Sequence, residues 1–235
     1  MLEFLRKSGK PKPLEPQAVY VSETGLVRTD NQDSVMISSG RGVFCVADGV
    51  GGAEAGAKAS AIVCREVSMM TRVDADSLES RIAAVRRGIV EANEVIFVEV
   101  GGGGTVRMGS TAAVLVLDPN EASRAGVVWV GDSRVYRIRH GLAKLLTRDH
   151  RAVDGNLLTR AVGCAVAVSC DACEVDVAPG DRFLVCTDGV HGVISDGRLA
   201  LFAAGGSIES AAERIAAEVV KAGAPDNYTF ILVAI

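Results

Sequence analysis

Two short stretches of the sequence combine an apolar run with an aspartate and a glycine. Residues 43–52 (VFCVADGVGG) contain Asp48, and residues 183–190 (FLVCTDGV) contain Asp188. An apolar strand that stops at Asp-Gly places a charge at the rim of a sheet, and glycines let a ligand or a metal approach the backbone closely. Asp-Gly is also a common turn pair, so either stretch alone is equally compatible with an ordinary turn.

Two further aspartates stand beside predicted strands. Asp33 precedes a strand expected over 34–37, and Asp226 precedes the final strand, expected over 228–235. If these strands belong to one sandwich, the four acids converge, and clustered carboxylates repel one another unless a cation neutralises them. Oxygen ligands without His or Cys favour Mg²⁺ or Mn²⁺ over Zn²⁺.

Arg28 lies on the polar connection that leads to Asp33. A lone arginine is most often a solvated surface charge, but beside an acidic cluster its planar fork of donors suits a phosphate bound next to a metal. With Asp48 shared between two ions, a bridging water would become a nucleophile at neutral pH. These residues indicate hydrolysis of a phosphoester at a two-metal centre.

The pattern of apolar residues predicts the elements that must position these side chains. Helical spacing indicates helices over 53–70, over 78–96 with Asp74 or Asp76 as the N-cap, and from Ser207 to a cap at Gly223. Apolar or alternating segments indicate strands at 18–21, 34–37, 43–48, 111–117, 125–130, 134–138, 142–146, 173–177, 182–186 and 228–235. A further short segment is expected over 157–162.

The composition indicates one domain and limits the kinds of partner. Residues 1–16 form a basic, proline-containing stretch expected to be a flexible tail, and residues 17–235 are expected to fold as one domain. The net charge of -4 and the pI near 5.5 leave no basic footprint for nucleic acid. The sequence has no signal peptide and no apolar run of membrane-spanning length, so we expect a cytoplasmic protein without a membrane partner.

The six cysteines are expected to be free thiols in a reducing compartment. Cys170 and Cys173 have CxxC spacing, but no second pair accompanies them and they do not open a helix, so we expect a structural role. The glycine-rich stretches 49–58 and 101–104 lack the lysine-serine signature of a phosphate loop.

Six motifs, in this order, resemble the type 2C metal-dependent protein phosphatases, especially their compact bacterial members. They are residues 28–33 (RTDNQD), 46–52 (VADGVGG), 108–111 (MGST), 131–134 (GDSR), 186–189 (CTDG) and 225–227 (PDN). Each motif is weak alone, but together they cover essentially the whole chain from about residue 18. The resemblance implies an α+β fold, a four-layer α-β-β-α sandwich of two antiparallel sheets flanked by helices.

The resemblance also implies a role for each matched acid. Asp48 would bridge two Mn²⁺ or Mg²⁺ ions, and Gly49 would offer its backbone carbonyl. Asp188 and Asp226 would ligate one ion directly, and Asp33 matches the acid at the end of the first motif.

Two further positions match residues of the family outside the two-ion core. Arg28 matches the phosphate-binding arginine. Asp132 falls on an acid that helps to hold a third, weaker ion together with the acid matched by Asp188. On its local sequence alone, Asp132 is more often only a turn residue.

The sequence departs from the family pattern in the region of the flap and of the proton donor. Val50 stands where many eukaryotic members carry a histidine proposed as general acid. His191 is an alternative donor in principle, although we expect it to be a packing or surface residue. Residues 151–156 replace a much longer flap, a segment tied to substrate choice and to the third ion.

We therefore expect a protein-serine/threonine phosphatase whose substrate is a phosphorylated protein and which reverses a bacterial Ser/Thr kinase. One alternative is a catalytically silent relative that binds phosphoproteins or a regulator. Another is a stress-response or sporulation phosphatase of the same fold that acts on a phosphoserine anti-sigma antagonist. A monomer is expected, although no sequence feature fixes the oligomeric state.

Overall fold

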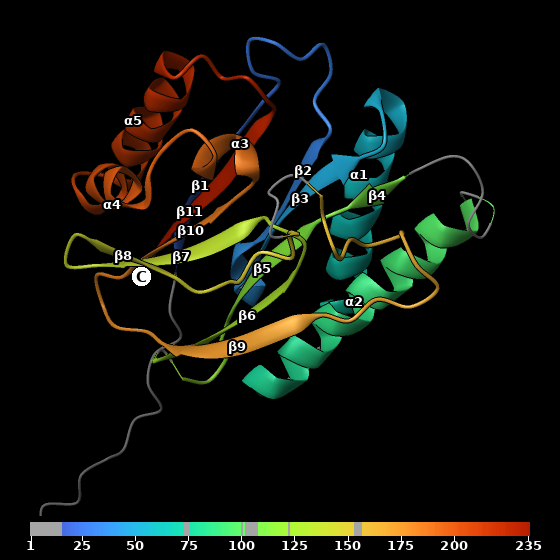
Figure 1. Cartoon of the computed structure of the whole chain (residues 1–235). Helices are drawn as coiled ribbons and strands as arrows, with labels where there is room; N and C mark the ends of the chain where they lie inside the picture. The colour runs from blue at the N-terminus through green and yellow to red at the C-terminus, as the bar shows by residue number, and fades with distance from the viewer. Residues whose placement is uncertain (1–15, 73–75, 100, 102–107, 122, 153–156) are drawn as a thin grey trace, which may run out of the picture.

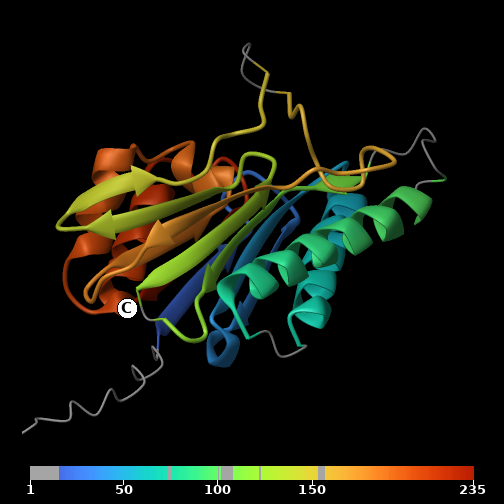
Figure 2. The same ribbon diagram turned by 90° about the horizontal axis from the view of Figure 1, so that it is seen from below.

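The computed structural model describes residues 16–72, 76–99, 101, 108–121, 123–152 and 157–235. Two antiparallel sheets lie face to face, and helices cover the outer face of each (Figures 1 and 2). The expected four-layer α-β-β-α sandwich is thus confirmed. The predicted tail over 1–16 lies almost wholly outside the described residues, as does Asp74.

The first sheet brings the two ends of the chain together. Its strands, in spatial order, are β1 (Gln17–Glu23), β11 (Tyr228–Ala234), β10 (Arg182–Cys186), β7 (Arg134–Arg139) and β8 (Leu142–Leu145). Helices α4 (Asp196–Ala204) and α5 (Ile208–Lys221) cover its outer face, and the short α3 (Asp188–His191) follows β10 (Figure 1).

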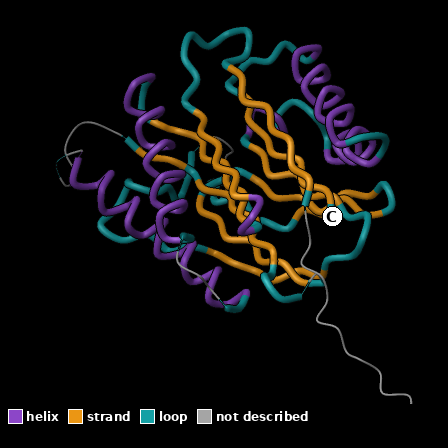
Figure 3. The backbone as a smooth tube through the Cα atoms, turned by 180° about the vertical axis from the view of Figure 1, so that it is seen from behind, coloured by secondary structure: helices purple, strands orange, loops and turns teal. Residues whose placement is uncertain are grey.

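The second sheet carries the remaining strands. In spatial order they are β2 (Asp33–Ser38), β3 (Val43–Val50), β5 (Ala112–Leu117), β6 (Arg124–Val130) and β9 (Asp171–Asp176), with β4 (Gly109–Ser110) paired to the end of β3. The 3-10 turn η1 (Ser39–Arg41) joins β2 to β3. Helices α1 (Ala53–Met70) and α2 (Leu78–Glu99) lie together on its outer face (Figure 3).

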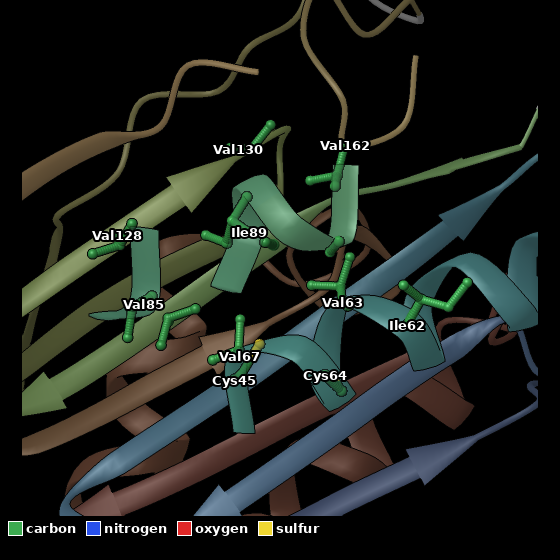
Figure 4. Close-up of a cluster of buried hydrophobic side chains, with 14 of the residues drawn as sticks. Cys45, Ile62, Val63, Cys64, Val67, Val85, Ile89, Val128, Val130 and Val162 are labelled. Carbon is green, nitrogen blue, oxygen red and sulfur yellow. The ribbon is translucent and has the colours of Figure 1, made fainter. Parts of the chain in front are cut away.

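Three apolar layers hold the sandwich together. On β3, Phe44 and Val46 point into the layer between the sheets, whereas Cys45 and Ala47 point toward α1 and α2. Because both faces of β3 are buried, the strand reads as a continuous apolar run. Figure 4 shows the helix-facing layer, in which valines of α1 and α2 pack against the sheet. A third layer lies between the first sheet and α4 and α5.

Local sequence signals account for several helix ends. The predicted bounds of α1 are confirmed, and Ser207 caps α5 by accepting from the backbone N–H of Ser210 at 3.2 Å. Gly223, with φ of 96°, ends that helix in a left-handed conformation that favours glycine. At α2 the predicted cap was wrong, because the Ser77 hydroxyl accepts from the N–H of Ser80 at 3.1 Å.

The strands nearest the predicted site differ from the expectation. β3 does not stop at Asp48 but continues to Val50, because β4 supplies a backbone partner for Gly49 and Val50. Asp188 is the first residue of α3. Within the short segment expected over 157–162, Leu158 and Val162 form isolated bridges to Arg151 and Ser110. Helix α4 was not predicted.

The two cysteines of the CxxC stretch lie on opposite faces of the second sheet. Cys170 packs against the helix-facing layer, and Cys173 packs against the layer between the sheets. Cys45, Cys64, Cys170, Cys173 and Cys186 are free thiols. The structural role expected for this pair agrees with their placement.

No helix in the described part of the chain has the length and apolar character needed to cross a membrane.

Candidate metal centre

Asp33 and Asp48 form the floor of the candidate site. They are register partners on the antiparallel strands β2 and β3, so their side chains project from the same face. The Thr187 hydroxyl, which follows β10 in the other sheet, donates to Asp33 Oδ2 at 2.9 Å. This part of the site is therefore built from residues of both sheets.

Burial and mutual repulsion shift the protonation of these acids. Burial, reinforced by the charges of Asp188 and Asp226, raises the pKa of Asp33 to about 7 despite the hydrogen bonds that Asp33 accepts. The pKa of Asp48 is raised well above its usual value by burial and then by the charges of Asp33, Asp188, Asp132 and Asp226. The five acids named from the sequence thus act on one another electrostatically. Such a set of carboxylates favours the binding of a cation.

Arg28 lies at the rim of the cluster and pairs with Asp226. Its Nη2 donates to Asp226 Oδ2 at 2.9 Å, and its Nε lies 2.8 Å from Asp226 Oδ1. The hydrogen bond and charge of Asp226 raise the pKa of Arg28, with smaller contributions from Asp48 and Asp188. Half of the Arg28 side chain is exposed, so its guanidinium can be reached from solvent.

Asn227 holds the loop that carries Arg28, which connects β1 to β2 at the top of Figure 1. Its Oδ1 accepts from the N–H of Gln32 at 2.9 Å, and its Nδ2 donates to the carbonyls of Thr24 and Asp30, each at 2.8 Å. Sequence reasoning did not identify this role, although Asn227 stands in the PDN motif. The side chain is buried, so these hydrogen bonds are shielded from water.

Gly49 is required by close packing of the backbone. A Cβ at this position would lie 2.0 Å from the carbonyl oxygen of Gly56 and 2.7 Å from that of Gln32. The N–H of Gly49 donates to the same Gln32 carbonyl at 3.1 Å. Residue 49 must therefore lack a side chain for α1 to approach the end of β3. The role of its carbonyl as a metal ligand stays a prediction.

Asp132 lies in the turn between β6 and β7 and is connected to the floor of the site. Its neighbour Ser133 shares a 2.6 Å hydrogen bond with the Thr111 hydroxyl, which accepts from the N–H of Asp48 at 2.9 Å. Arg151 pairs with Asp132 Oδ2 through Nε and with Asp188 Oδ2 through Nη2, the latter at 2.7 Å. Sequence reasoning treated Arg151 only as part of a short link and missed these pairs.

His191 lies beside the cluster but is poorly suited to donate a proton. Its Nε2 donates to the backbone carbonyl of Asp132 at 3.0 Å. Burial, reinforced by the positive charge of Arg134, lowers the pKa of His191 to about 4. The imidazole is therefore neutral at pH 7, which agrees with the expected packing role.

The donor set suits a hard divalent cation. Its carboxylate oxygens are ligands that Mg²⁺ and Mn²⁺ accept. As they stand, the described side chains include no ready-made group of three His, Cys, Asp or Glu around one point. Oxygens of Asp226, Asp188 and Asp132 are instead paired with Arg28 or Arg151.

Comparison with known proteins places these residues in a wider context. Residues 22–222 match the family model of protein phosphatase 2C. The serine/threonine protein phosphatase PstP of Mycobacterium tuberculosis is 30% identical over an alignment of 236 positions. The alignment covers 90% of this chain and 43% of that protein. The chain therefore spans less than half the length of this relative.

Two solved structures share the fold over nearly their whole length. PppA, described as a key regulatory component of T6SS in Pseudomonas aeruginosa, has a TM-score of 0.86 and 31% identity, covering 94% of this chain and 98% of that one. The catalytic domain of PstP in complex with two manganese ions has a TM-score of 0.81 and 28% identity, covering 93% and 97%.

Proposed function

The chain belongs to the protein phosphatase 2C family, and on this basis we propose that residues 17–235 form a metal-dependent phosphatase acting on phosphoserine and phosphothreonine in proteins. The single observation that carries the proposal is that the charges of Asp33, Asp188 and Asp226 all act on Asp48, while Arg28 is paired with Asp226 beside them. We take Asp48, the Gly49 carbonyl, Asp188, Asp226 and Asp33 as the groups that hold two ions, Mn²⁺ or Mg²⁺.

The charge balance of the site supports this assignment. Five carboxylates face two guanidinium groups, those of Arg28 and Arg151, so the protein alone leaves an excess of negative charge. Divalent ions bound there would neutralise the acids, polarise the phosphate and lower the pKa of water enough to supply a nucleophile at neutral pH. The similar catalytic domain of PstP was solved in complex with two manganese ions, which supports the same stoichiometry here.

The residues of the chain supply binding and orientation. The planar fork of Arg28 matches the geometry of a phosphate, and the Asn227 hydrogen bonds fix the loop that presents it. When Arg28 turns to a phosphate, the oxygens of Asp226 become available to an ion. Asp33 is oriented by the Thr187 hydroxyl. His191 is neutral and donates to a carbonyl, so proton transfer to the leaving group is not assigned to it.

We further propose that the enzyme is a monomer in the cytoplasm and opposes a Ser/Thr kinase in a bacterial signalling pathway. The description of the similar protein PppA as a key regulatory component of T6SS supports a regulatory role. The acidic net charge gives no reason to propose a nucleic-acid partner.

Release of phosphate from a phosphothreonine peptide tests the proposal. The wild-type chain is assayed with Mn²⁺, with Mg²⁺ and with chelator, beside Asp188→Asn and the matched control Asp176→Asn, whose acid pairs with Arg137 and Arg139 away from the site. We expect turnover that needs the metal, is lost in Asp188→Asn and is kept in Asp176→Asn. A folded wild-type protein without turnover in any metal would instead favour the catalytically silent alternative.

A further inference from the structure

Arg151 joins two acids that come from different parts of the fold. Asp132 lies in the turn that follows β6, and Asp188 begins α3 after β10. The two donor nitrogens Nε and Nη2 of the Arg151 guanidinium contact one carboxylate each, through Oδ2 of Asp132 and Oδ2 of Asp188. A single guanidinium therefore bridges the pair of acids that the family resemblance assigns to a third ion.

Resting on the proposed function, we propose that Arg151 is a built-in cation that occupies the position between Asp132 and Asp188 and limits this centre to two metal ions. The third ion does not fit the residues as the structure arranges them, because its position is taken by a guanidinium. The pairing uses Oδ2 of Asp188, so Oδ1 of the same carboxylate would be the oxygen that holds an ion together with Asp226.

The backbone around Arg151 holds the arginine against Asp132. The N–H of His150 donates to the carbonyl of Gly131 at 2.9 Å, and His150 Nδ1 accepts from the N–H of Gly131 at 3.0 Å. On the other side, Arg151 forms a bridge with Leu158. The residue before Arg151 is thus fixed to the residue before Asp132. The fold therefore places the backbone of Arg151 beside that of Asp132, within reach of its carboxylate.

Burial distinguishes this ion pair from that of Arg28. The Asp132 side chain is 4% exposed and those of Arg151 and Asp188 are each 30% exposed, whereas the side chains of Arg28 and Asp226 are 50% and 38% exposed. Exposed ion pairs contribute little and exchange readily, whereas removal of one partner from a buried pair leaves an uncompensated charge. We therefore expect the Arg28 pair to open for a phosphate and a metal, and the Arg151 pair to persist.

Counting bound ions tests the inference without relying on turnover. The purified chain is dialysed to equilibrium against a series of Mn²⁺ concentrations, and the metal per chain is measured by elemental analysis. We expect wild type to bind two ions, Arg151→Met to bind one more, and the double variant Arg151→Met with Asp132→Asn to return to the wild-type number. The control is Arg139→Met, which removes an arginine that also pairs with two acids, Asp176 and Asp181, at the other end of β7.

The proposed function and the inference have separate readouts. The two-metal centre is tested by the number of ions that wild type binds and by the loss of these ions in Asp48→Asn. The difference between Arg151→Met and wild type tests the role of Arg151. The inference is overturned if wild type binds a third ion that Asp132→Asn removes, or if Arg151→Met, shown by circular dichroism to be folded, gains none. If Arg151→Met does not fold, the number of ions bound by wild type is compared with the number bound by Asp132→Asn. Two ions in both proteins support the inference.

Discussion

Asp33 and Asp48 face each other across strands β2 and β3 as direct register partners, two carboxylates on one face of a sheet. Like charges at such positions destabilise a sheet. The protein therefore carries an unfavourable arrangement at the position where the proposed metals bind, as expected where stability is given up for function.

Asp48→Asn should stabilise the metal-free protein. Burial and the neighbouring acids raise the pKa of Asp48, so at neutral pH folding must either protonate this carboxyl or bury its charge. Asparagine removes that cost, and the expected gain is about 0.5–1 kcal/mol. In Mn²⁺ the order should reverse, because wild type gains about 2.7 kcal/mol at a hundredfold excess of ion over its dissociation constant. Thermal unfolding with chelator and with Mn²⁺ measures both effects. A variant that melts below wild type in chelator would contradict the proposed repulsion.

Asn227→Ala should release the loop that carries Arg28. The change leaves the N–H of Gln32 and the carbonyls of Thr24 and Asp30 without this partner, at a cost of roughly 2–3 kcal/mol in the free energy of unfolding. Because Arg28 loses its fixed position, KM for a phosphopeptide should rise more than kcat falls. Steady-state kinetics of the folded variant measure the changes in KM and in kcat separately. The control is Asn120→Ala, an exposed asparagine that contacts Asp76 far from the site; equal effects of the two changes would exclude the positioning role.

Gly49→Ala should disrupt the junction between β3 and α1. The added methyl group would lie 2.0 Å from the Gly56 carbonyl oxygen, so the helix must move, at a cost of about 1–3 kcal/mol or more. Gly40→Ala is the matched control, because a Cβ there meets nothing within 4 Å. Urea unfolding of both variants provides the comparison. A Gly49→Ala protein as stable as Gly40→Ala would show that the packing at this junction is looser than described.

The thiol of Cys170 should react slowly at neutral pH. Burial raises the pKa of Cys170 to about 11, and only the thiolate is nucleophilic, so its alkylation should accelerate about tenfold per pH unit up to about pH 11. Peptide mass spectrometry after timed treatment with iodoacetamide follows this residue directly. A rate that levels off near pH 8, or a disulfide between Cys170 and Cys173, would point to the redox motif that their opposite orientation argues against.

Local patterns predicted most elements of the fold. The apolar stripe of α1 and the buried run of β3 carry their own periodicity, and Ser207 and Gly223 mark the ends of α5 by local hydrogen bonding and backbone conformation. Helix α4 was missed because it is short and begins with Asp196-Gly197, a pair that is typical of a turn. These failures occur where the local sequence is ambiguous.

The parts of the site that could not be predicted depend on distant segments. β3 extends past Asp48 only because β4, some sixty residues later, pairs with Gly49 and Val50. Arg151 contacts acids from the turn between β6 and β7 and from the start of α3, and no spacing in the sequence relates it to Asp132 or Asp188. The acids themselves could be proposed because a charge beside a buried strand is unusual and the motif order is specific.

The location of bound metal tests the central claim most directly. Crystals grown with Mn²⁺ and inorganic phosphate are measured at the manganese absorption edge, so that anomalous scattering locates each ion independently of the protein atoms. We predict two peaks that share Asp48 as a ligand, with Arg28 turned from Asp226 to the phosphate and Arg151 still on Asp132. Full occupancy by Mn²⁺ elsewhere on the chain, with none beside Asp48, would contradict the account.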